Sequence, residues 1–203
     1  MVDMDILQLN TPLGWALVVA AYLIGSIATA VVVARLAGIA DPRTQGSGNP
    51  GATNVLRLGG KRLAALTLLG DLIKGFMPVA LAAWLGGDSA LLALVALAAF
   101  SGHLYPVWFG FRGGKGVATA LGVLLGLCWP VALVVLACWI VVALLSRMSS
   151  PAALTAAFIA PAAMAFFSAD ATLTAAVTVM SVLLWWRHRS NLLRLLKGEE
   201  KKF

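Results

Sequence analysis

The chain has 203 residues, of which 61% are hydrophobic and only 11% are charged. Its mean hydropathy is +0.95. A soluble domain is about half apolar and about a quarter charged, so this composition excludes an ordinary soluble protein and a disordered one. We therefore expect an integral membrane protein, in which residues 1–203 form a single all-α domain, a polytopic helical bundle.

The formal net charge is +7, with 15 Lys and Arg against 8 Asp and Glu. In a membrane protein this excess indicates a positive-inside bias and attraction to anionic headgroups, with phosphorylated substrates as a further option and no nucleic acid as a partner. Cys128 and Cys138 have no CxxC spacing and no neighbouring His, so we expect apolar packing and no metal site. The first ten residues carry Asp3 and Asp5 but no basic residue, which argues against a signal peptide and for retention of the first apolar run.

Apolar segments along the chain predict about seven membrane-spanning helices, since a crossing needs about 20 apolar residues. In chain order they are 13–34, 63–85, 90–109, 117–127, 129–145, 151–169 and 171–186. The fourth segment is only about 16 Å long as a helix, and it could continue into the fifth as one long tilted helix. Pro130 and the combined length favour two spans instead.

The charges support this count. Apart from Lys74, all basic residues fall on alternate connections, namely 35–62, 112–115, Arg147 and the tail from Arg187. The positive-inside rule then places the N-terminus outside and the C-terminus in the cytosol. Merging the fourth and fifth segments would put Arg147 and the basic tail outside. Tryptophans lie at predicted span ends, as an aromatic belt requires: Trp84, Trp108, Trp129, Trp185 and Trp186.

A first polar segment, residues 46–54, reads Gly-Ser-Gly-Asn-Pro-Gly-Ala-Thr-Asn and is followed by Arg57. Dense small residues let backbone N–H groups face a ligand, and with the nearby Arg the segment looks like a phosphate cradle. A flexible loop of turn residues is the alternative, and composition alone favours it.

A second polar segment, residues 102–119, places Gly113, Gly114 and Gly116 around Lys115 just before a predicted helix. Peptide N–H groups, the helix N-terminus and the Lys cation can favour the same phosphate, which we prefer to a simple positive-inside turn. It is not a Walker A loop, because Phe109 takes the first Gly position and Gly116 replaces the hydroxyl residue. NTP hydrolysis is therefore not expected. His103 could be a general base, although a hydrogen-bonded interfacial His is commoner.

The third polar segment, residues 187–199, predicts an interfacial basic helix with Arg187, Arg194 and Lys197 toward water or headgroups. His188 and Asn191 share one face of it and could point at a site.

Within the second apolar segment, Asp71 and Lys74 are one turn apart and lie roughly 13–18 Å from its cytosolic end. Groups at that depth pair or line a cavity, so a structural ion pair and a site role remain equally open.

Together the three segments resemble one family, the acyl-phosphate-dependent glycerol-3-phosphate acyltransferases of the PlsY type. The resemblance spans nearly the whole chain and includes A-Y-L-I-G-S-I at residues 21–27 and D-L-I-K-G at residues 71–75. It implies a seven-helix enzyme of the bacterial inner (plasma) membrane with its active site facing the cytosol. The implied reaction moves a fatty acyl group from acyl phosphate to the 1-hydroxyl of glycerol 3-phosphate, the first step of phospholipid synthesis. No cofactor is implied; the bilayer and the soluble enzyme that makes acyl phosphate are implied partners.

The resemblance also implies roles for individual residues. Those implied to be catalytic are Ser47, Arg57, His188 and Asn191. Those implied to bind substrate are Gly48, Asn49, Thr53, Asn54, Arg112, Gly113, Gly114, Lys115, Gly116 and Ser150. The register at the serine leaves Ser149 open, and Glu199 matches an acidic position usually assigned to structure.

The chemistry that these residues offer is direct transfer. Neither His103 nor His188 is followed by an acid in an H-x-x-x-x-D pattern, and no Ser-His-Asp set is visible. Acyl phosphate is already activated and needs mainly charge neutralisation and positioning. The base could be the donor phosphate, with His188 second. The alternatives from other classes are a transporter or channel for a phosphorylated solute and a lipid-binding scaffold.

Overall fold

A computed structural model describes residues 8–202, so Asp3 and Asp5 lie outside the described residues. The chain is all-helical, as predicted. In chain order the elements are α1 (Pro12–Gly25), α2 (Thr29–Leu36), α3 (Ala52–Trp84), α4 (Ser89–Leu104), the 3-10 turn η1 (Val107–Phe109), α5 (Val117–Leu127), α6 (Trp129–Ser146), α7 (Ser149–Ser168), α8 (Ala171–Arg187) and α9 (Arg189–Leu196).

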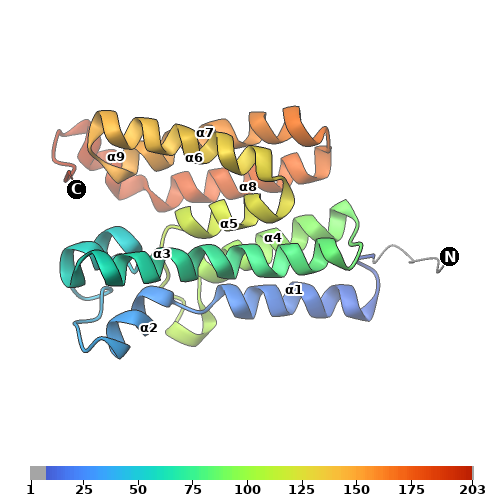
Figure 1. Cartoon of the computed structure of the whole chain (residues 1–203), viewed down its shortest axis with the longest axis horizontal. Coiled ribbons are helices and arrows are strands. Elements are labelled where there is room, and N and C mark those ends of the chain that lie inside the picture. The colour runs from blue at the N-terminus through green and yellow to red at the C-terminus, as the bar shows by residue number, and fades with distance from the viewer. Residues whose placement is uncertain (1–7, 203) are drawn as a thin grey trace.

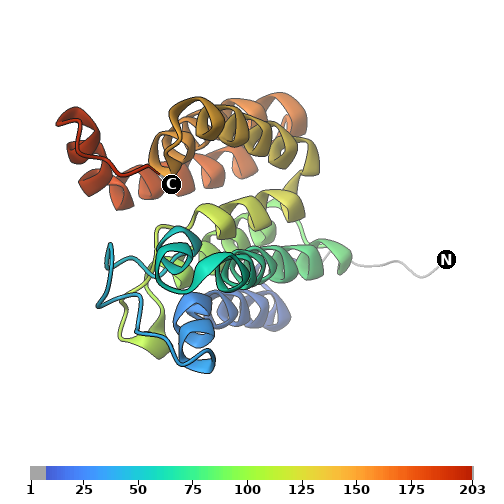
Figure 2. The same ribbon diagram turned by 60° about the vertical axis from the view of Figure 1, so that its left-hand side comes forward.

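The helices form two layers with α5 between them (Figure 1). Helices α1 to α4 make one layer and α6 to α9 the other, and the turned view in Figure 2 shows the same separation. Small residues let the helices approach closely, since a Cβ at Gly25 would collide with the backbone of Ala99, and one at Gly122 with the backbone of Leu72. The short helix α5 is thereby packed tightly against α3 and joins the two layers.

Several helices are long and apolar enough to cross a bilayer, which confirms a multi-pass membrane protein. They are α3, α4 with η1, α6 and α7, and the bent pair of α1 and α2 counts as a fifth. The shorter apolar helices α5 and α8 would both have to cross to reach the predicted seven. The count of seven therefore stays a prediction.

The prediction of one continuous helix over residues 13–34 was wrong. The helix is interrupted between Gly25 and Thr29, and α2 is turned by 44° from α1. The break leaves the carbonyl of Ile27 outside the helical ladder, and Lys74 Nζ donates to it at 2.6 Å. A side chain from another helix thus stabilises the bend.

The second predicted span, 63–85, begins close to the kink in α3, but the polar connection before it is not entirely a loop. Helix α3 begins at Ala52 rather than at residue 63, so the end of the predicted polar connection is helical. Gly60 interrupts this helix with φ 80° and ψ −177°, a conformation that is essentially restricted to glycine. The kink separates the short polar stretch 52–59 from the membrane part of α3.

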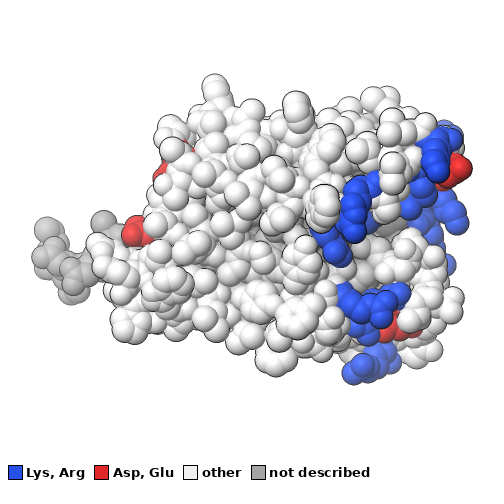
Figure 3. Space-filling model, turned by 180° about the vertical axis from the view of Figure 1, so that it is seen from behind, with Lys and Arg blue, Asp and Glu red and all other residues white. Residues whose placement is uncertain are grey.

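Charge is distributed along the long axis of the molecule. Lys and Arg gather at one end, with a broad uncharged band beside them and only acidic residues visible toward the other end (Figure 3). Trp84 and Trp129, at the ends of α3 and α6, are exposed, as the prediction of tryptophans at span ends requires. Both glycine-rich loops lie at the basic end, where the candidate site is found.

Candidate active site

The first glycine-rich loop connects α2 to α3 and is held by the buried side chain of Asn54. Its Nδ2 donates to the carbonyls of Pro42 at 2.9 Å and Gln45 at 3.0 Å, while its Oδ1 accepts from the N–H of Ser47 at 3.0 Å. Gly46 and Gly48 have φ of 64° and 71°, in the left-handed region that glycine favours. The loop is therefore a built structure, and Asn54, predicted to bind substrate, uses its amide to shape it.

The other predicted residues of this segment line its surface. Ser47 and Gly48 are exposed, and Asn49 and Thr53 are half-buried. Arg57 is exposed on the first turns of α3, and its Nη2 donates to the carbonyl of Lys202 at 3.4 Å. The C-terminal tail therefore reaches the start of α3, next to the first loop.

The second glycine-rich loop packs on the end of α4. A Cβ at Gly113 would collide with the carbonyl oxygens of His103 and Leu104, and one at Gly114 with the His103 ring. The N–H of Gly114 donates to the carbonyl of His103 at 3.2 Å. Of these three glycines, Gly116 has a positive φ, 87°, and it is the N-cap of α5. Gly113 and Gly114 are therefore required for close packing, and the N–H of Gly114 is already used within the protein.

Arg187 fixes this loop from the other layer. Its Nε donates to the carbonyl of Gly114 at 3.0 Å and its Nη2 to that of Gly113 at 2.7 Å. The prediction that Arg187 faces water or headgroups was wrong. Its neighbour His188 was singled out from the sequence, but nothing in the pattern indicated carbonyl oxygens of a distant loop as partners.

Beside the loop lies a polar cluster formed by Lys115, Ser150, Asn191, Arg194 and Glu200. Lys115 Nζ donates to Asn191 Oδ1, and Asn191 Nδ2 donates to Glu200 Oε1 at 2.6 Å. Ser150 Oγ donates to the same oxygen at 2.6 Å, and Arg194 Nε donates to Glu200 Oε2 at 2.8 Å. The cluster links the start of α5 and the start of α7 with helix α9. It contains three of the predicted site residues, Lys115, Ser150 and Asn191.

The cluster bears on three of the residues discussed from the sequence. Ser150, preferred over Ser149, is the serine in the cluster, where it is buried. The acidic residue is Glu200, whereas Glu199 is exposed, so the match to Glu199 was one residue out of register. Arg194, predicted to face water, keeps 39% of its side chain exposed while its Nε donates to Glu200 Oε2. Counted from Gly198, the Gly-x-Glu spacing of the family motif already falls on Glu200, so the sequence alone separates the two glutamates.

The cluster carries opposing electrostatic effects. Burial lowers the pKa of Lys115 to about 8; the carboxylate of Glu200 opposes this, and the charges of Arg194, Arg187 and Arg57 add to it. Burial would raise the pKa of Glu200, but hydrogen bonds from Ser150, Asn191 and Arg194 outweigh it, so the pKa is lowered. Lys115 therefore lies in a field of cations that an anion would relieve.

His188 is buried at the junction of α8 and α9. Its Nδ1 lies 2.9 Å from the carbonyl of Leu184, which can only accept, so Nδ1 carries the hydrogen and Nε2 is left as an acceptor. Burial, followed by the charge of Lys115, lowers the pKa of His188 to about 4. The ring is neutral at physiological pH.

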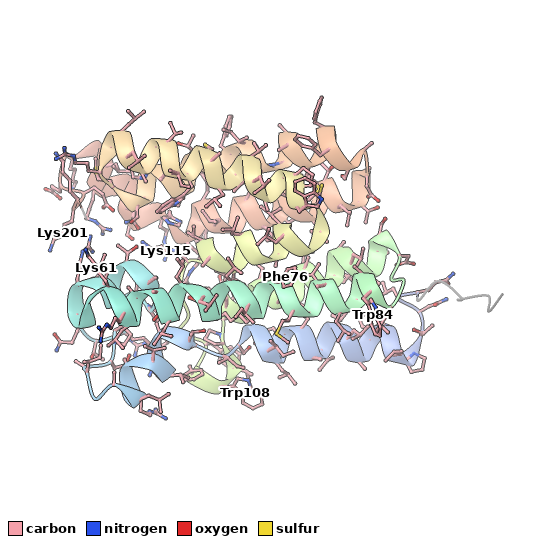
Figure 4. The ribbon with its side chains drawn as sticks, viewed as in Figure 1. Lys61, Phe76, Trp84, Trp108, Lys115 and Lys201 are labelled. Atoms are coloured by element: carbon pink, nitrogen blue, oxygen red, sulfur yellow. The ribbon has the colours of Figure 1, made fainter. Side chains whose placement is uncertain are left out.

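Arg112 is a predicted site residue that lies outside the polar cluster and away from Lys115. It is exposed, and its charge acts on Asp41 rather than on Lys115. Figure 4 shows Lys115 between the two layers, at the same end of the molecule as Lys61 and Lys201 and away from Trp84.

An apolar cavity lies next to the cluster, between α5, α6, α7 and α8. Its volume is only about 40 Å³, well below the roughly 300–1,000 Å³ of a ligand pocket, and it is partly open to the side. Its lining includes Val117 and Leu184, close in sequence to Lys115 and His188, and it ends near Leu124 and Ala160. The basic end of the molecule and a small apolar cavity are thus adjacent.

Comparisons with known proteins identify the family of the chain. Residues 15–198 match the family model for glycerol-3-phosphate acyltransferase. The chain is similar to the glycerol-3-phosphate acyltransferases of Thioalkalivibrio sulfidiphilus, with 58% identity over 187 residues and 92% of both chains covered, and of Methylococcus capsulatus, with 56% identity over 191 residues, 94% of this chain and 96% of that one.

Solved structures lead to the same family. The glycerol 3-phosphate form of PlsY, an integral membrane glycerol 3-phosphate acyltransferase, is 42% identical and superposes with a TM-score of 0.90 over 94% of this chain and 95% of that one. Its lysophosphatidic acid form gives a TM-score of 0.87 at 41% identity over the same shares of the two chains. This protein belongs to the glycerol-3-phosphate acyltransferase family and is an integral membrane acyltransferase.

Proposed function

We propose that this enzyme transfers a fatty acyl group from acyl phosphate to the 1-hydroxyl of sn-glycerol 3-phosphate, giving lysophosphatidate and inorganic phosphate. The glycerol 3-phosphate and lysophosphatidic acid forms of the similar PlsY support the acceptor and the product. The observation that carries the proposal is the half-buried ammonium of Lys115, at the start of α5, between a glycine-rich loop and an apolar cavity.

The phosphate groups would bind at the basic end. Lys115 provides a charge whose pKa is lowered by burial, and Arg57 adds a second cation nearby. The first N–H groups of α5 follow Gly116, and no side chain in residues 8–202 caps them. Helix N-termini with such free donors favour anions, and the Lys charge reinforces this one.

The acyl chain would enter at the apolar cavity, whose helices would have to move apart to hold it, because its volume is only about 40 Å³. Its wall on α7 consists of alanines, including Ala153, Ala156 and Ala157, which leave room between the helices. The cavity lining runs from Val117 to Leu124 on α5, about 10.5 Å of helix, and over an equal length from Leu184 to Val177 on α8. An acyl chain would lie along this length with its phosphate near Lys115.

The transfer itself would be direct. The 1-hydroxyl oxygen bonds to the acyl carbonyl carbon, the bond from that carbon to the phosphate oxygen breaks, and the hydroxyl proton passes to the departing phosphate. His188, with a pKa of about 4, is a weak base at neutral pH, so the donor phosphate is the better acceptor. His188 Nε2 would instead accept a hydrogen bond from the glycerol hydroxyl and orient it.

The distribution of basic residues also indicates how the enzyme is oriented in the membrane. We expect the enzyme in the bacterial inner membrane with its basic end in the cytosol, because basic residues favour that side. A soluble enzyme that makes acyl phosphate would deliver the donor there. The transporter alternative loses its support, because the chain belongs to an acyltransferase family.

The donor test is an assay of purified protein with labelled glycerol 3-phosphate. Acyl phosphate should give lysophosphatidate and an equal amount of inorganic phosphate without metal, nucleotide or thioester. His188→Gln should lose less than the roughly 100-fold that removing a general base costs. A requirement for acyl-CoA or magnesium-ATP would refute the donor assignment.

A further inference from the structure

A buried group of polar side chains lies beneath the two loops, outside the polar cluster. Asp71, Lys74, His103 and Thr119 are all at most 6% exposed and come from α3, α4 and α5. Asp71 Oδ1 lies 2.9 Å from Lys74 Nζ and 3.5 Å from His103 Nδ1. Thr119 Oγ1 lies 3.0 Å from His103 Nδ1. The group is connected, and the reaction described above uses none of it.

One end of this group reaches the first loop through the bend. Lys74 donates to the carbonyl of Ile27 at 2.6 Å, within the break between α1 and α2. Helix α2 then packs on α3, where Gly70 leaves space for Thr29, and leads directly into the loop of residues 37–51. The direction of α2, and so the position of the loop, depends on how the bend is held.

The other end reaches the second loop through His103. The carbonyl of His103 accepts from the N–H of Gly114, and its ring lies against the Cα of Gly114. A Cβ built on Gly114 would be 3.1 Å from the carbonyl oxygen of Pro50, which belongs to the first loop. The ring therefore lies below the point where the two loops meet.

We propose that Asp71, Lys74, His103 and Thr119 form a positioning network that sets both phosphate-binding loops relative to each other. Lys74 holds the bend that directs the first loop, His103 supports the second, and Asp71 connects the two. The inference rests on the proposed function for its kinetic consequences, but its effect on loop structure can be measured independently.

Bundle stability alone does not account for this arrangement. Taking an ion pair out of water costs about as much as the pair returns, and well-packed apolar residues of similar volume are often as stable or more stable. Apolar replacements could not, however, bond the free carbonyl of Ile27 or the ring of His103. A polar network here is useful because it fixes orientation.

The first test replaces the ion pair by residues of similar volume, in the double variant Asp71→Leu, Lys74→Met. Single replacements leave one unpaired buried charge and can fail to fold, whereas the double variant removes both. We expect a thermal midpoint close to that of the wild type and a KM for glycerol 3-phosphate raised about tenfold or more. A purely structural pair would change the amount of active enzyme, and thus apparent kcat, but not KM.

A matched pair of variants tests the His103 arm. Thr119→Val keeps the shape of the side chain but removes the hydroxyl, whereas Thr119→Ser keeps the hydroxyl. We expect Thr119→Val to raise the same KM roughly three- to tenfold, the value of one hydrogen bond, and Thr119→Ser to stay near wild type. As a control, Asp88→Ala removes the cap of α4 at the opposite end and should lower the thermal midpoint without changing KM.

Hydrogen–deuterium exchange makes the test independent of turnover. In the double variant, amides of residues 41–51 and 110–116 should exchange faster than in the wild type, while those of α7 stay unchanged. Wild-type exchange in both loops would overturn the network even if the enzyme is active. If the wild type shows no acyl transfer, the proposed function fails, and exchange alone then decides whether the network positions the loops.

Discussion

Lys115 is the residue on which the proposed phosphate site most depends. Charge-assisted hydrogen bonds to phosphate are worth about 1.5–3 kcal/mol, and each 1.4 kcal/mol is about tenfold. Lys115→Ala should therefore lower kcat/KM about ten- to 100-fold, with partial rescue at best by Lys115→Arg because its charge has a different shape. Lys201→Ala, at the same end of the molecule, should be nearly neutral. Wild-type kinetics in a folded Lys115→Ala protein would remove the loop from the site.

The environment of Lys115 also predicts a pH dependence. With a pKa of about 8, lowered chiefly by burial, its ammonium is present below this pH and lost as the pH rises through it. In the free enzyme, kcat/KM should therefore decline on the alkaline side near pH 8. Lys115→Arg stays charged, so its profile should lack this decline. The measurement is kcat/KM from pH 6.5 to 9.5 for both proteins, and identical alkaline limbs would contradict the assignment.

The sequence indicated which residues belong to the candidate site better than it indicated which residues they contact. The segment with Lys115 was recognisable because glycines and a cation precede a helix, and His188 and Asn191 because they share a helical face. The role of Glu200 depends on the tail folding back onto Ser150, a contact 50 residues away in sequence. Gly114 was expected to offer its N–H to a phosphate, but glycine is required there because a Cβ would collide with the His103 ring. Both contacts join residues from different segments of the chain, so no local sequence pattern predicts them.

Among the elements, α3 carries a testable strain site at Gly60. A non-glycine residue there would cost about 1–3 kcal/mol, because φ 80° with ψ −177° is a region only glycine visits freely. Nothing lies within 4 Å of a Cβ built on it, so the effect of Gly60→Ala would be purely conformational. We expect a lower thermal midpoint and a clear loss of kcat/KM, since residues 52–59 carry Arg57.

The control on the same helix is Leu66→Ala, because this exposed side chain is not part of the site. It should leave kcat/KM unchanged. If Gly60→Ala melted and turned over like the wild type, the kink would have no part in placing Arg57.

Helix boundaries were less predictable than helix existence. Hydropathy identified every apolar segment, but not the break at residues 26–28, because averaging over a window does not register the Gly25-Ser26 pair there. The bend is stabilised by Lys74 from another helix. The polar residues 52–62 looked like a loop, whereas they begin α3 because Asn54 and its neighbours fold against the preceding loop. Contacts between distant segments decided both cases.

For the whole molecule, composition and charge were sufficient to predict a helical membrane protein with one basic end. The observed separation of basic and acidic ends around an uncharged band agrees with that prediction (Figure 3). Whether α5 and α8 cross the bilayer cannot be read from their length alone, because both are shorter than a full span. The alternation of charged connections still favours seven spans.

Acyl transfer in vesicles of known sidedness tests the central claim, that the basic end is a cytosolic acyl phosphate-dependent active site. Glycerol 3-phosphate and acyl phosphate would be added outside inverted and right-side-out membrane vesicles made from cells that produce the protein or its Lys115→Ala variant. We predict labelled lysophosphatidate from inverted vesicles, and from right-side-out vesicles only after permeabilisation, with a large loss in the variant. Product formed only by intact right-side-out vesicles, or formed only with acyl-CoA, would contradict the account.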